Sequence, residues 1–156
     1  MSDPLAVERG VSVITIPDIW WQCCDISVAL LANLLGKQLA KEAGVFEAWQ
    51  IDHEGKVSEG TSPNAWTVTS DVTVVTRQAD SAIRNSVTRL AGLDIVRREG
   101  YGFVERAFSV AEAKSARVAL VMSTAIALLP FVRIDGAAVG DGKLRETYLA
   151  HAASTK

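Results

Sequence analysis

The chain has 156 residues, of which 49% are hydrophobic and 22% charged, an ordinary composition for one globular domain, here residues 1–156, with a core of its own. The net charge of -2 argues against nucleic-acid or membrane-surface binding, since both favour a basic patch. The best apolar run, residues 118–132, is too short to cross a bilayer, and the first residues do not resemble a signal peptide. We therefore expect a cytoplasmic protein.

The first part of the chain predicts a strand followed by a helix. Residues 11–16 are rich in β-branched side chains, which are typical of a strand. The helix is expected to begin at Ser27, a candidate N-cap, and to stop at Gly44. Its apolar residues recur every three or four positions, so we expect them to face the core, with Lys37 and Lys41 facing water. That apolar stripe consists of Val28, Leu31, Leu35 and Leu39.

Strands and helices continue to alternate along the rest of the chain. Alternating apolar residues and glycine turns predict the strands, and capping residues and apolar periodicity predict the helices. The helix that begins at Ser86 is expected to pack through Val87, Leu90 and Ile95. The predicted strands are 46–51, a hairpin return from Val57, 64–69, 73–77, 103–108, 118–122 and 128–134, and the predicted helices are 86–99, 109–116 and 144–152.

Metal chemistry is not expected. The two cysteines, Cys23 and Cys24, are adjacent, and the two histidines, His53 and His151, are far apart in the sequence. Metal-binding cysteines are usually separated by two to four residues, so neither pair has the spacing of a zinc site.

The segment Asp25-Ile26-Ser27 resembles the strand-to-helix junction of the class IV (fold type IV) pyridoxal-phosphate aminotransferases, which include D-amino-acid and branched-chain transaminases. The family reads Asp-Ile-Lys-Ser at this point, and its lysine carries the cofactor as a Schiff base. The resemblance covers nearly the whole chain. It implies an α/β fold, the pseudo-barrel of the family's large C-terminal domain, without the family's N-terminal domain.

The stretch Glu59-Gly60-Thr61-Ser62-Pro63-Asn64 resembles the family motif Glu-Gly-x-x-x-Asn, which implies that Glu59 and Asn64 bind the cofactor. In the family the glutamate pairs with the pyridine nitrogen. A carboxylate there raises the pKa of the nitrogen and keeps it protonated, which makes the ring a better electron sink. Pro63 replaces a small polar residue, so the local backbone is expected to differ. The alternative is that Glu59 is a solvated carboxylate at a strand end.

Residues 83–89 resemble the family loop Leu-x-Gly-Ile-Thr-Arg, which holds the cofactor phosphate at a helix start, where unpaired N–H groups and the helix dipole favour an anion. Val87, Thr88 and Arg89 match this loop, and Val87 and Thr88 are the candidates for cofactor binding. Ser86 replaces the family's glycine and is expected to hinder binding if the position needs positive φ or a close approach of the phosphate. Arg84 replaces the leucine that packs on the cofactor ring. The alternative is a helix capped by Ser86 or Asn85, with no ligand.

Residues 122–126 stand where the family has a second phosphate-binding segment, Thr-Ser-x-Thr-Thr. Ser123 and Thr124 keep hydroxyl groups and complete the set of candidate cofactor-binding residues. The alternative for this segment is a buried strand end.

No catalytic residue is assigned, because the family lysine is missing between Ile26 and Ser27. Lys37 and Lys41 follow Ser27 by about three and four helical turns, at roughly 1.5 Å per residue, which is too far to replace it. The lysine both holds the cofactor aldehyde and moves the substrate proton. Pyridoxal phosphate is therefore the expected cofactor by resemblance, without covalent attachment.

The resemblance implies amino transfer between an amino acid, with the D-amino-acid branch the most similar, and a 2-oxo acid. The missing lysine and domain predict a truncated, inactive member. The alternatives are a non-catalytic cofactor-binding or subunit-pairing domain and a relic related to the aminodeoxychorismate lyases. A homo-oligomer, or a separate chain supplying the N-terminal domain, is expected to cover apolar surface that includes Trp20 and Trp21.

Overall fold

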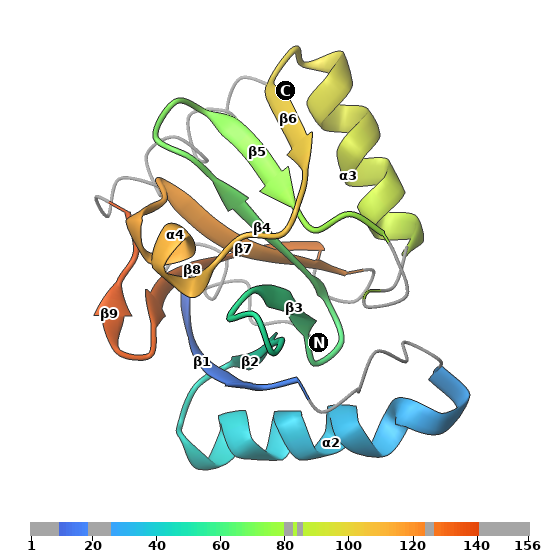
Figure 1. Cartoon of the computed structure of the whole chain (residues 1–156), viewed down its shortest axis with the longest axis vertical. Coiled ribbons are helices and arrows are strands. Elements are labelled where there is room, and N and C mark those ends of the chain that lie inside the picture. The colour runs from blue at the N-terminus through green and yellow to red at the C-terminus, as the bar shows by residue number, and fades with distance from the viewer. Residues whose placement is uncertain (1–9, 19–25, 80–82, 84–85, 124–126, 141–156) are drawn as a thin grey trace.

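In a computed structural model, the described residues are 10–18, 26–79, 83, 86–123 and 127–140, which form one curled sheet with helices on its outside (Figure 1). The strands are β1 Val11–Pro17, β2 Glu47–Ile51, β3 Val57–Gly60, β4 Asn64–Val68, β5 Thr73–Thr76, β6 Gly102–Glu105, β7 Val118–Ser123, β8 Ala127–Ile134 and β9 Ala137–Ala138. The helices are α2 Ile26–Glu42, α3 Val87–Arg98 and α4 Val110–Ser115.

The sheet is mixed and closes on itself. Its strand order is β3-β2-β1-β8-β7-β4-β5-β6, with β9 paired to β8. The pairs β1–β2, β1–β8 and β5–β6 are parallel, and the others are antiparallel. The two edges of the sheet meet where the backbone N–H of Val57 donates to the carbonyl of Phe108 at 2.9 Å, beside a bridge between Lys56 and Ser109. The predicted α/β pseudo-barrel is confirmed.

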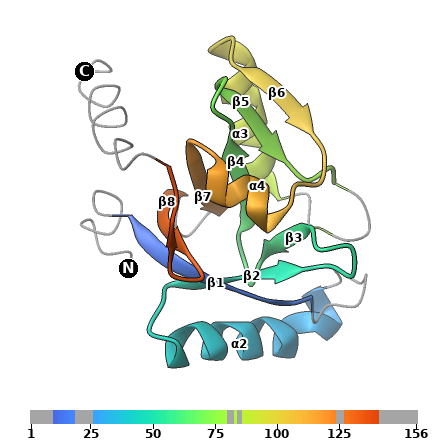
Figure 2. The same cartoon turned by 60° about the vertical axis from the view of Figure 1, so that its left-hand side comes forward.

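The main core lies inside the curl. Trp49 is at its centre and makes edge-to-face contacts with Phe108 and Phe131, with ring centroids 5.9 and 5.2 Å away. Residues alternate along each strand, so Val13 of β1 joins this core while Ile16 packs towards Ala40 of α2. The other side of β4 and β7 packs in the same way against α3. The two helices therefore cover different parts of the sheet's outer surface (Figure 2).

Helix α2 has the predicted length but not the predicted orientation. Leu31 and Leu35 are 67% and 52% exposed, whereas Gly36 and Ala40 face the sheet and are buried. A Cβ atom on Gly36 would lie 2.5 Å from Cγ2 of Thr61, so α2 approaches the sheet through its smallest residues. The prediction that the leucine stripe enters the core is wrong. Apolar periodicity identifies one face of a helix but does not show which part of the structure, if any, packs against that face.

Two further predictions about α2 need correction. The helix begins at Ile26, so Ser27 lies within its first turn and is not the N-cap. Lys37 is not on the wet face: it is partly buried and its Nζ lies 2.5 Å from Oε2 of the fully buried Glu47. The predicted end is confirmed, because Gly44 takes a φ of +68° just beyond the helix.

Helix α3 begins and ends as predicted, with Ser86 as N-cap and Glu99 as C-cap. Its expected packing face is wrong, because Val87 is 81% and Ile95 60% exposed. The side that faces the sheet carries Arg89, Gly92 and Leu93 instead. A buried arginine in this set is the feature that an apolar pattern could not predict.

The remaining differences are small. Strand β6 ends at Glu105, three residues before the predicted end, since the chain turns Phe108 inward to close the curl. Strand β9 was not predicted. The predicted helix 144–152, like Trp20, Trp21, Cys23 and Cys24, lies outside the described residues. Within the described ranges, the helices fall short of the length and apolarity needed to cross a membrane.

Candidate functional site

The predicted site residues come from elements that meet at one edge of the fold. Figure 1 shows the starts of α2 and α3 on the same, right-hand side of the view. Asn64, the first residue of β4, pairs with Met122 near the end of β7, so Ser123 is one residue further along that neighbouring strand. Glu59 belongs to β3, directly before the turn into β4. Thr124, Arg84 and Asn85 lie outside the described residues.

Glu59 is buried, with 3% of its surface exposed, so the solvated-carboxylate alternative is wrong. Its Oε2 accepts a hydrogen bond from Nδ2 of Asn64 at 3.2 Å. A buried carboxylate is stable only with such donors around it. Pro63 suits the turn between the two residues, because its carbonyl accepts from the backbone N–H of Gly60 at 2.9 Å. The segment from Glu59 to Asn64 thus forms a hydrogen-bonded turn whose carboxylate lies in the interior.

Ser86 connects this motif to helix α3. Its Oγ donates to Oδ1 of Asn64 at 2.7 Å and accepts from the backbone N–H of Arg89 at 3.1 Å. Ser86 has a φ of −71° and a ψ of 152°, an extended conformation that any residue adopts. The position therefore does not need positive φ, whereas the expected hindrance of a closely approaching phosphate stays a prediction. Glu59, Asn64 and Ser86 form one hydrogen-bonded series, which joins residues too far apart in the sequence for local patterns to reveal.

The first turn of α3 offers donors to an anion. The N–H of Arg89 binds Ser86 Oγ, and the N–H of Leu90 binds the Ser86 carbonyl at 3.1 Å. Val87 and Thr88 precede these two residues in the first turn of the helix. The dipole of the helix is also positive at this end. The turn therefore suits a phosphate or a carboxylate.

Arg89 holds this turn against the sheet. Its guanidinium is 1% exposed, and its Nη2 donates to the carbonyl of Arg77 at 2.9 Å and lies 2.5 Å from Oε1 of Glu105. Arg77 in turn donates from Nη1 to Oδ2 of Asp52 at 2.6 Å. Burial raises the pKa of the Asp52 carboxyl, but the hydrogen bonds from Arg77 and from the backbone N–H groups of Lys56 and Glu54 outweigh it and lower that pKa.

A partly buried ion pair between Lys37 and Glu47 fixes the motif to α2. Glu47 accepts from Lys37 and, through Oε1, from the hydroxyl of Thr61 at 2.5 Å and the N–H of Thr61 at 3.2 Å. Thr61 is the third residue of the motif that begins at Glu59. Lys37 is therefore held by Glu47 rather than directed at the start of α2, which lies about 15 Å back along the helix at 1.5 Å per residue.

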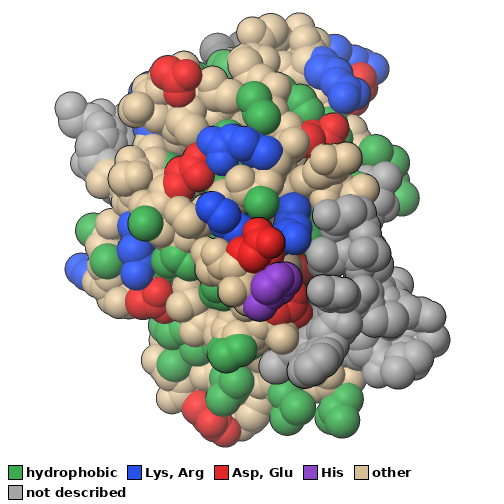
Figure 3. Space-filling model, viewed as in Figure 1, with side chains coloured by type: hydrophobic (Ala, Val, Ile, Leu, Met, Phe, Trp, Pro, Cys, Tyr) green, Lys and Arg blue, Asp and Glu red, His purple; other side chains and the backbone are tan. Residues whose placement is uncertain are grey.

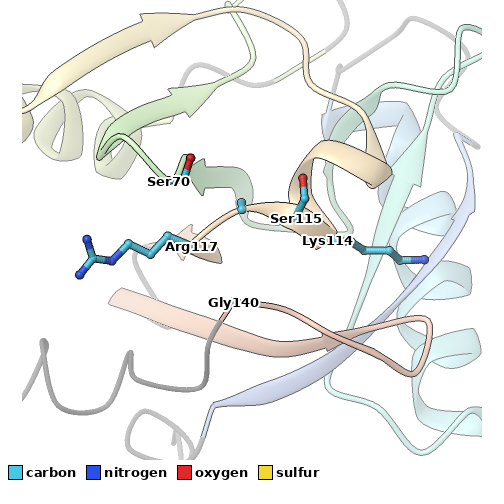
Figure 4. A pocket seen from close by; sticks show the side chains of 6 residues that line it. Ser70, Lys114, Ser115, Arg117 and Gly140 are labelled. Carbon is cyan, nitrogen blue, oxygen red and sulfur yellow. The ribbon is translucent and has the colours of Figure 1, made fainter.

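One hollow of the described surface lies elsewhere. It has a volume of about 640 Å³ and is lined by residues of the β4–β5 turn, the end of α4 and the start of β7. In Figure 4 its two cations, Lys114 and Arg117, point in opposite directions, and Lys114 binds Asp135 at 3.1 Å. Its charged side chains do not converge on one point, and the predicted site residues that the structure describes do not line it.

Comparison with known proteins agrees with this geometry. A family profile described as Amino-transferase class IV matches residues 11–134. The D-alanine aminotransferase of Bacillus licheniformis is 37% identical over 136 residues, which cover 86% of this chain and 47% of that protein. The D-alanine aminotransferase of Staphylococcus haemolyticus is 38% identical over 140 residues, covering 88% of this chain and 49% of that protein. The chain thus spans about half the length of these curated relatives.

Solved structures share the fold. The branched-chain amino acid aminotransferase of Escherichia coli superposes with a TM-score of 0.82 at 21% identity, covering 97% of this chain and 53% of that one. A branched-chain amino acid aminotransferase from T.th., solved with pyridoxamine 5'-phosphate, gives a TM-score of 0.80 at 23% identity, covering 100% of this chain and 55% of that one. With the family profile matching most of its length, this chain belongs to the class IV aminotransferase family.

Proposed function

We propose that this domain binds pyridoxal phosphate, or its amine form pyridoxamine phosphate, without a covalent bond, and that it does not transfer amino groups by itself. The observation that carries the proposal is the hydrogen-bonded series Glu59–Asn64–Ser86. It joins a buried carboxylate, suited to a pyridinium nitrogen, to a helix start suited to a phosphate. A ligand that carries both a pyridinium nitrogen and a phosphate matches this arrangement.

The residues that would hold the cofactor divide into two groups. Glu59, kept in place by Asn64, would face the ring nitrogen and raise the pKa of that nitrogen. The first-turn N–H groups of Val87 and Thr88 would bind the phosphate, with a hydroxyl from Ser123 at the end of β7 and, by family resemblance, from Thr124. When bound, the cofactor supplies an electron sink for a substrate carbanion. A branched-chain amino acid aminotransferase of the same fold was solved with pyridoxamine 5'-phosphate.

Covalent attachment does not fit the chain. The sequence runs directly from Ile26 to Ser27, and both residues lie in the first turn of α2. Lys37 is bound to the buried Glu47, and Lys41 is one turn further away. Along the described part of α2, neither the attachment of an aldehyde nor a lysine-mediated proton transfer therefore has a candidate residue. If a lysine is supplied by other means, the substrates we propose are an amino acid, D-configured as in the D-alanine relatives, and a 2-oxo acid.

The proposal is tested by calorimetric titration with pyridoxamine phosphate, which cannot attach covalently to a lysine. The wild type should form a 1:1 complex. Glu59→Gln keeps an oxygen for Asn64 but loses the charge, and should weaken that complex roughly tenfold, the size of a charge-assisted hydrogen bond. Glu54→Gln, at an exposed carboxylate in the β2–β3 turn, is the matched control and should bind as the wild type does.

Two results would contradict the proposal. One is the absence of any binding by the folded wild type. The other is equal affinity of the Glu59→Gln and Glu54→Gln variants, because the buried carboxylate would then contribute nothing to the ligand. Inorganic phosphate serves as the second ligand: its affinity should be unchanged by Glu59→Gln, since phosphate does not reach the ring subsite.

A second role, subunit pairing, is supported by the outer face of α2. Leu31, Leu34, Leu35 and Leu39 are exposed there, and Figure 3 shows apolar side chains along the lower edge of the molecule, where α2 runs. We propose that a second copy, or a chain carrying the family's N-terminal domain, covers this stripe. Leu35→Glu should lower the mass measured by light scattering, and Ile95→Glu, at an exposed apolar position of α3, should not. A wild-type monomer at high concentration would contradict pairing between copies.

A further inference from the structure

Arg89 occupies a position that is unfavourable for a cation. It is the third residue after the N-cap Ser86, in the turn where the helix dipole disfavours positive charge. Its side chain is nonetheless 1% exposed. A buried guanidinium is stable only if its charge and its N–H groups are satisfied, so the acceptors around Arg89 determine what this residue does.

Two of those acceptors come from the ends of two neighbouring strands. Nη2 donates to the carbonyl of Arg77, the residue after β5, at 2.9 Å, and lies 2.5 Å from Oε1 of Glu105, the last residue of β6. The two strands are parallel, and Thr76 pairs with Glu105, so both acceptors lie at the same edge of the sheet. Arg89 therefore ties the first turn of α3 to the carboxyl ends of β5 and β6.

The same turn is held on its other side by the hydrogen bond from Ser86 to Asn64. The direction of the first-turn N–H groups is thus fixed from two sides, by a neutral pair and by an ion pair. Glu105 cancels the charge of Arg89, and its carboxylate is one-third exposed. The ion pair contributes orientation but little net charge at the helix start.

We propose that Arg89 is a positioning residue for the phosphate subsite of α3, and that Glu105 limits the attraction of this subsite for anions by cancelling the charge of Arg89. The proposal rests on the proposed function, in which a phosphate binds at this turn. In this proposal Arg89 sets the geometry of the turn, and Glu105 sets the electrostatic potential at the turn. A purely structural ion pair would not separate these two effects.

The two effects predict opposite results for two conservative variants. Arg89→Lys keeps the charge but replaces the rigid guanidinium, whose Nη2 reaches both acceptors, with a flexible ammonium group. Affinity for inorganic phosphate should therefore fall roughly tenfold. Glu105→Gln keeps an oxygen for Nη2 and removes a negative charge, so that affinity should rise by about three- to tenfold at low salt. The rise should shrink as salt screens the charges.

The experiment is a calorimetric titration of the wild type, Arg89→Lys and Glu105→Gln with inorganic phosphate and with pyridoxamine phosphate, at low and high salt. Arg98 and Asp94 form an exposed ion pair at the other end of α3 and provide the matched controls Arg98→Lys and Asp94→Asn, which should bind within twofold of the wild type. Hydrogen exchange of the Leu90 amide, measured without ligand, reports the order of the turn. Arg89→Lys should speed this exchange, and Glu105→Gln should not.

The inference fails if both variants change the phosphate affinity in the same direction, or if both bind as the controls do while the wild type binds. In that case the ion pair is only structural and the proposed function stands. If the folded wild type binds neither phosphate nor pyridoxamine phosphate, the proposed function fails and this inference fails with it. Unchanged exchange of Leu90 in Arg89→Lys would by itself overturn the positioning role.

Discussion

Ser86 Oγ donates to Oδ1 of Asn64 at 2.7 Å and accepts from the backbone N–H of Arg89 at 3.1 Å. One hydroxyl therefore caps helix α3 and attaches its start to the buried Glu59 motif. A glycine could adopt the extended backbone found at this position, but it could make neither contact. The serine that stands in place of the family's glycine thus makes two contacts that a glycine lacks.

This contact predicts the effect of restoring the family's residue. Ser86→Gly should weaken pyridoxamine phosphate binding, because the helix start loses its attachment to Asn64, although glycine remains an acceptable N-cap. Ser86→Ala should also lower the free energy of unfolding by about 1 kcal/mol, the usual effect of losing a cap. Calorimetric titration and denaturant unfolding measure the two effects. Tighter binding by Ser86→Gly would show that the serine hinders the phosphate after all.

The exposed leucines of α2 should contribute little to the stability of the isolated domain. Leu35→Ala removes a half-exposed side chain and should change the free energy of unfolding by less than about 1 kcal/mol. Leu93→Ala, at a buried position of α3, is the comparison and should cost about 2–5 kcal/mol. Denaturant unfolding at low protein concentration, where pairing between copies is weak, provides the measurement. Equal losses for the two variants would place the α2 stripe in the core.

Asp52 gives the stability a dependence on pH. Burial raises the pKa of its carboxyl, yet the hydrogen bonds from Arg77, Lys56 and Glu54 lower that pKa overall in the folded state. The resulting stabilisation is complete above the unfolded-state pKa of about 3.9 and is lost as the pH falls through the lower folded-state pKa.

Asp52→Asn should therefore destabilise the protein at pH 7, and the difference from the wild type should shrink as the pH falls below about 4. Circular dichroism during denaturant unfolding at a series of pH values measures this difference. A constant difference from neutral to acidic pH would show that the carboxyl does not titrate differently in the folded protein.

Reduction with borohydride tests the absence of covalent attachment. After the protein is mixed with one equivalent of pyridoxal phosphate and reduced, Lys37 and Lys41 should carry no pyridoxyl group. Lys37 is held 2.5 Å from the buried Glu47, and both lysines lie about 15 Å or more along the helix from its start. Peptide mass spectrometry provides the readout. Specific, complete modification of either lysine would refute this part of the proposal.

The order and approximate bounds of the strands and helices could be predicted from the sequence, because periodicity, caps and turns are local signals. The buried faces of α2 and α3 could not. In α2 the contact is made by Gly36 and Ala40, whose small size allows a close approach, and in α3 it includes the charged Arg89. Hydrophobic patterns predict that the opposite face of each helix is buried. They consider only which residues are apolar and ignore how closely a helix can approach the sheet.

The candidate site, like the fold, could be predicted from the sequence only in part. Glu59, Asn64, Val87, Thr88 and Ser123 were identified from family motifs, and the fold brings their elements to one edge. The links between them depend on which strands become neighbours, for example on Asn64 lying opposite Met122. The Ser86–Asn64 and Arg89–Glu105 contacts are therefore tertiary properties, and no local pattern contains them.

The central claim, a non-covalent cofactor site at the Glu59–Asn64–Ser86 edge, is tested most directly by NMR titration of the labelled protein with pyridoxamine phosphate. The account predicts saturable shifts in the backbone amides of Val87 and Thr88 and in the side-chain amide of Asn64, with Ser70 and Arg117, at the distant hollow, unaffected. Saturable shifts confined to Ser70 and Arg117, or no shift in the folded protein at millimolar ligand, would contradict it.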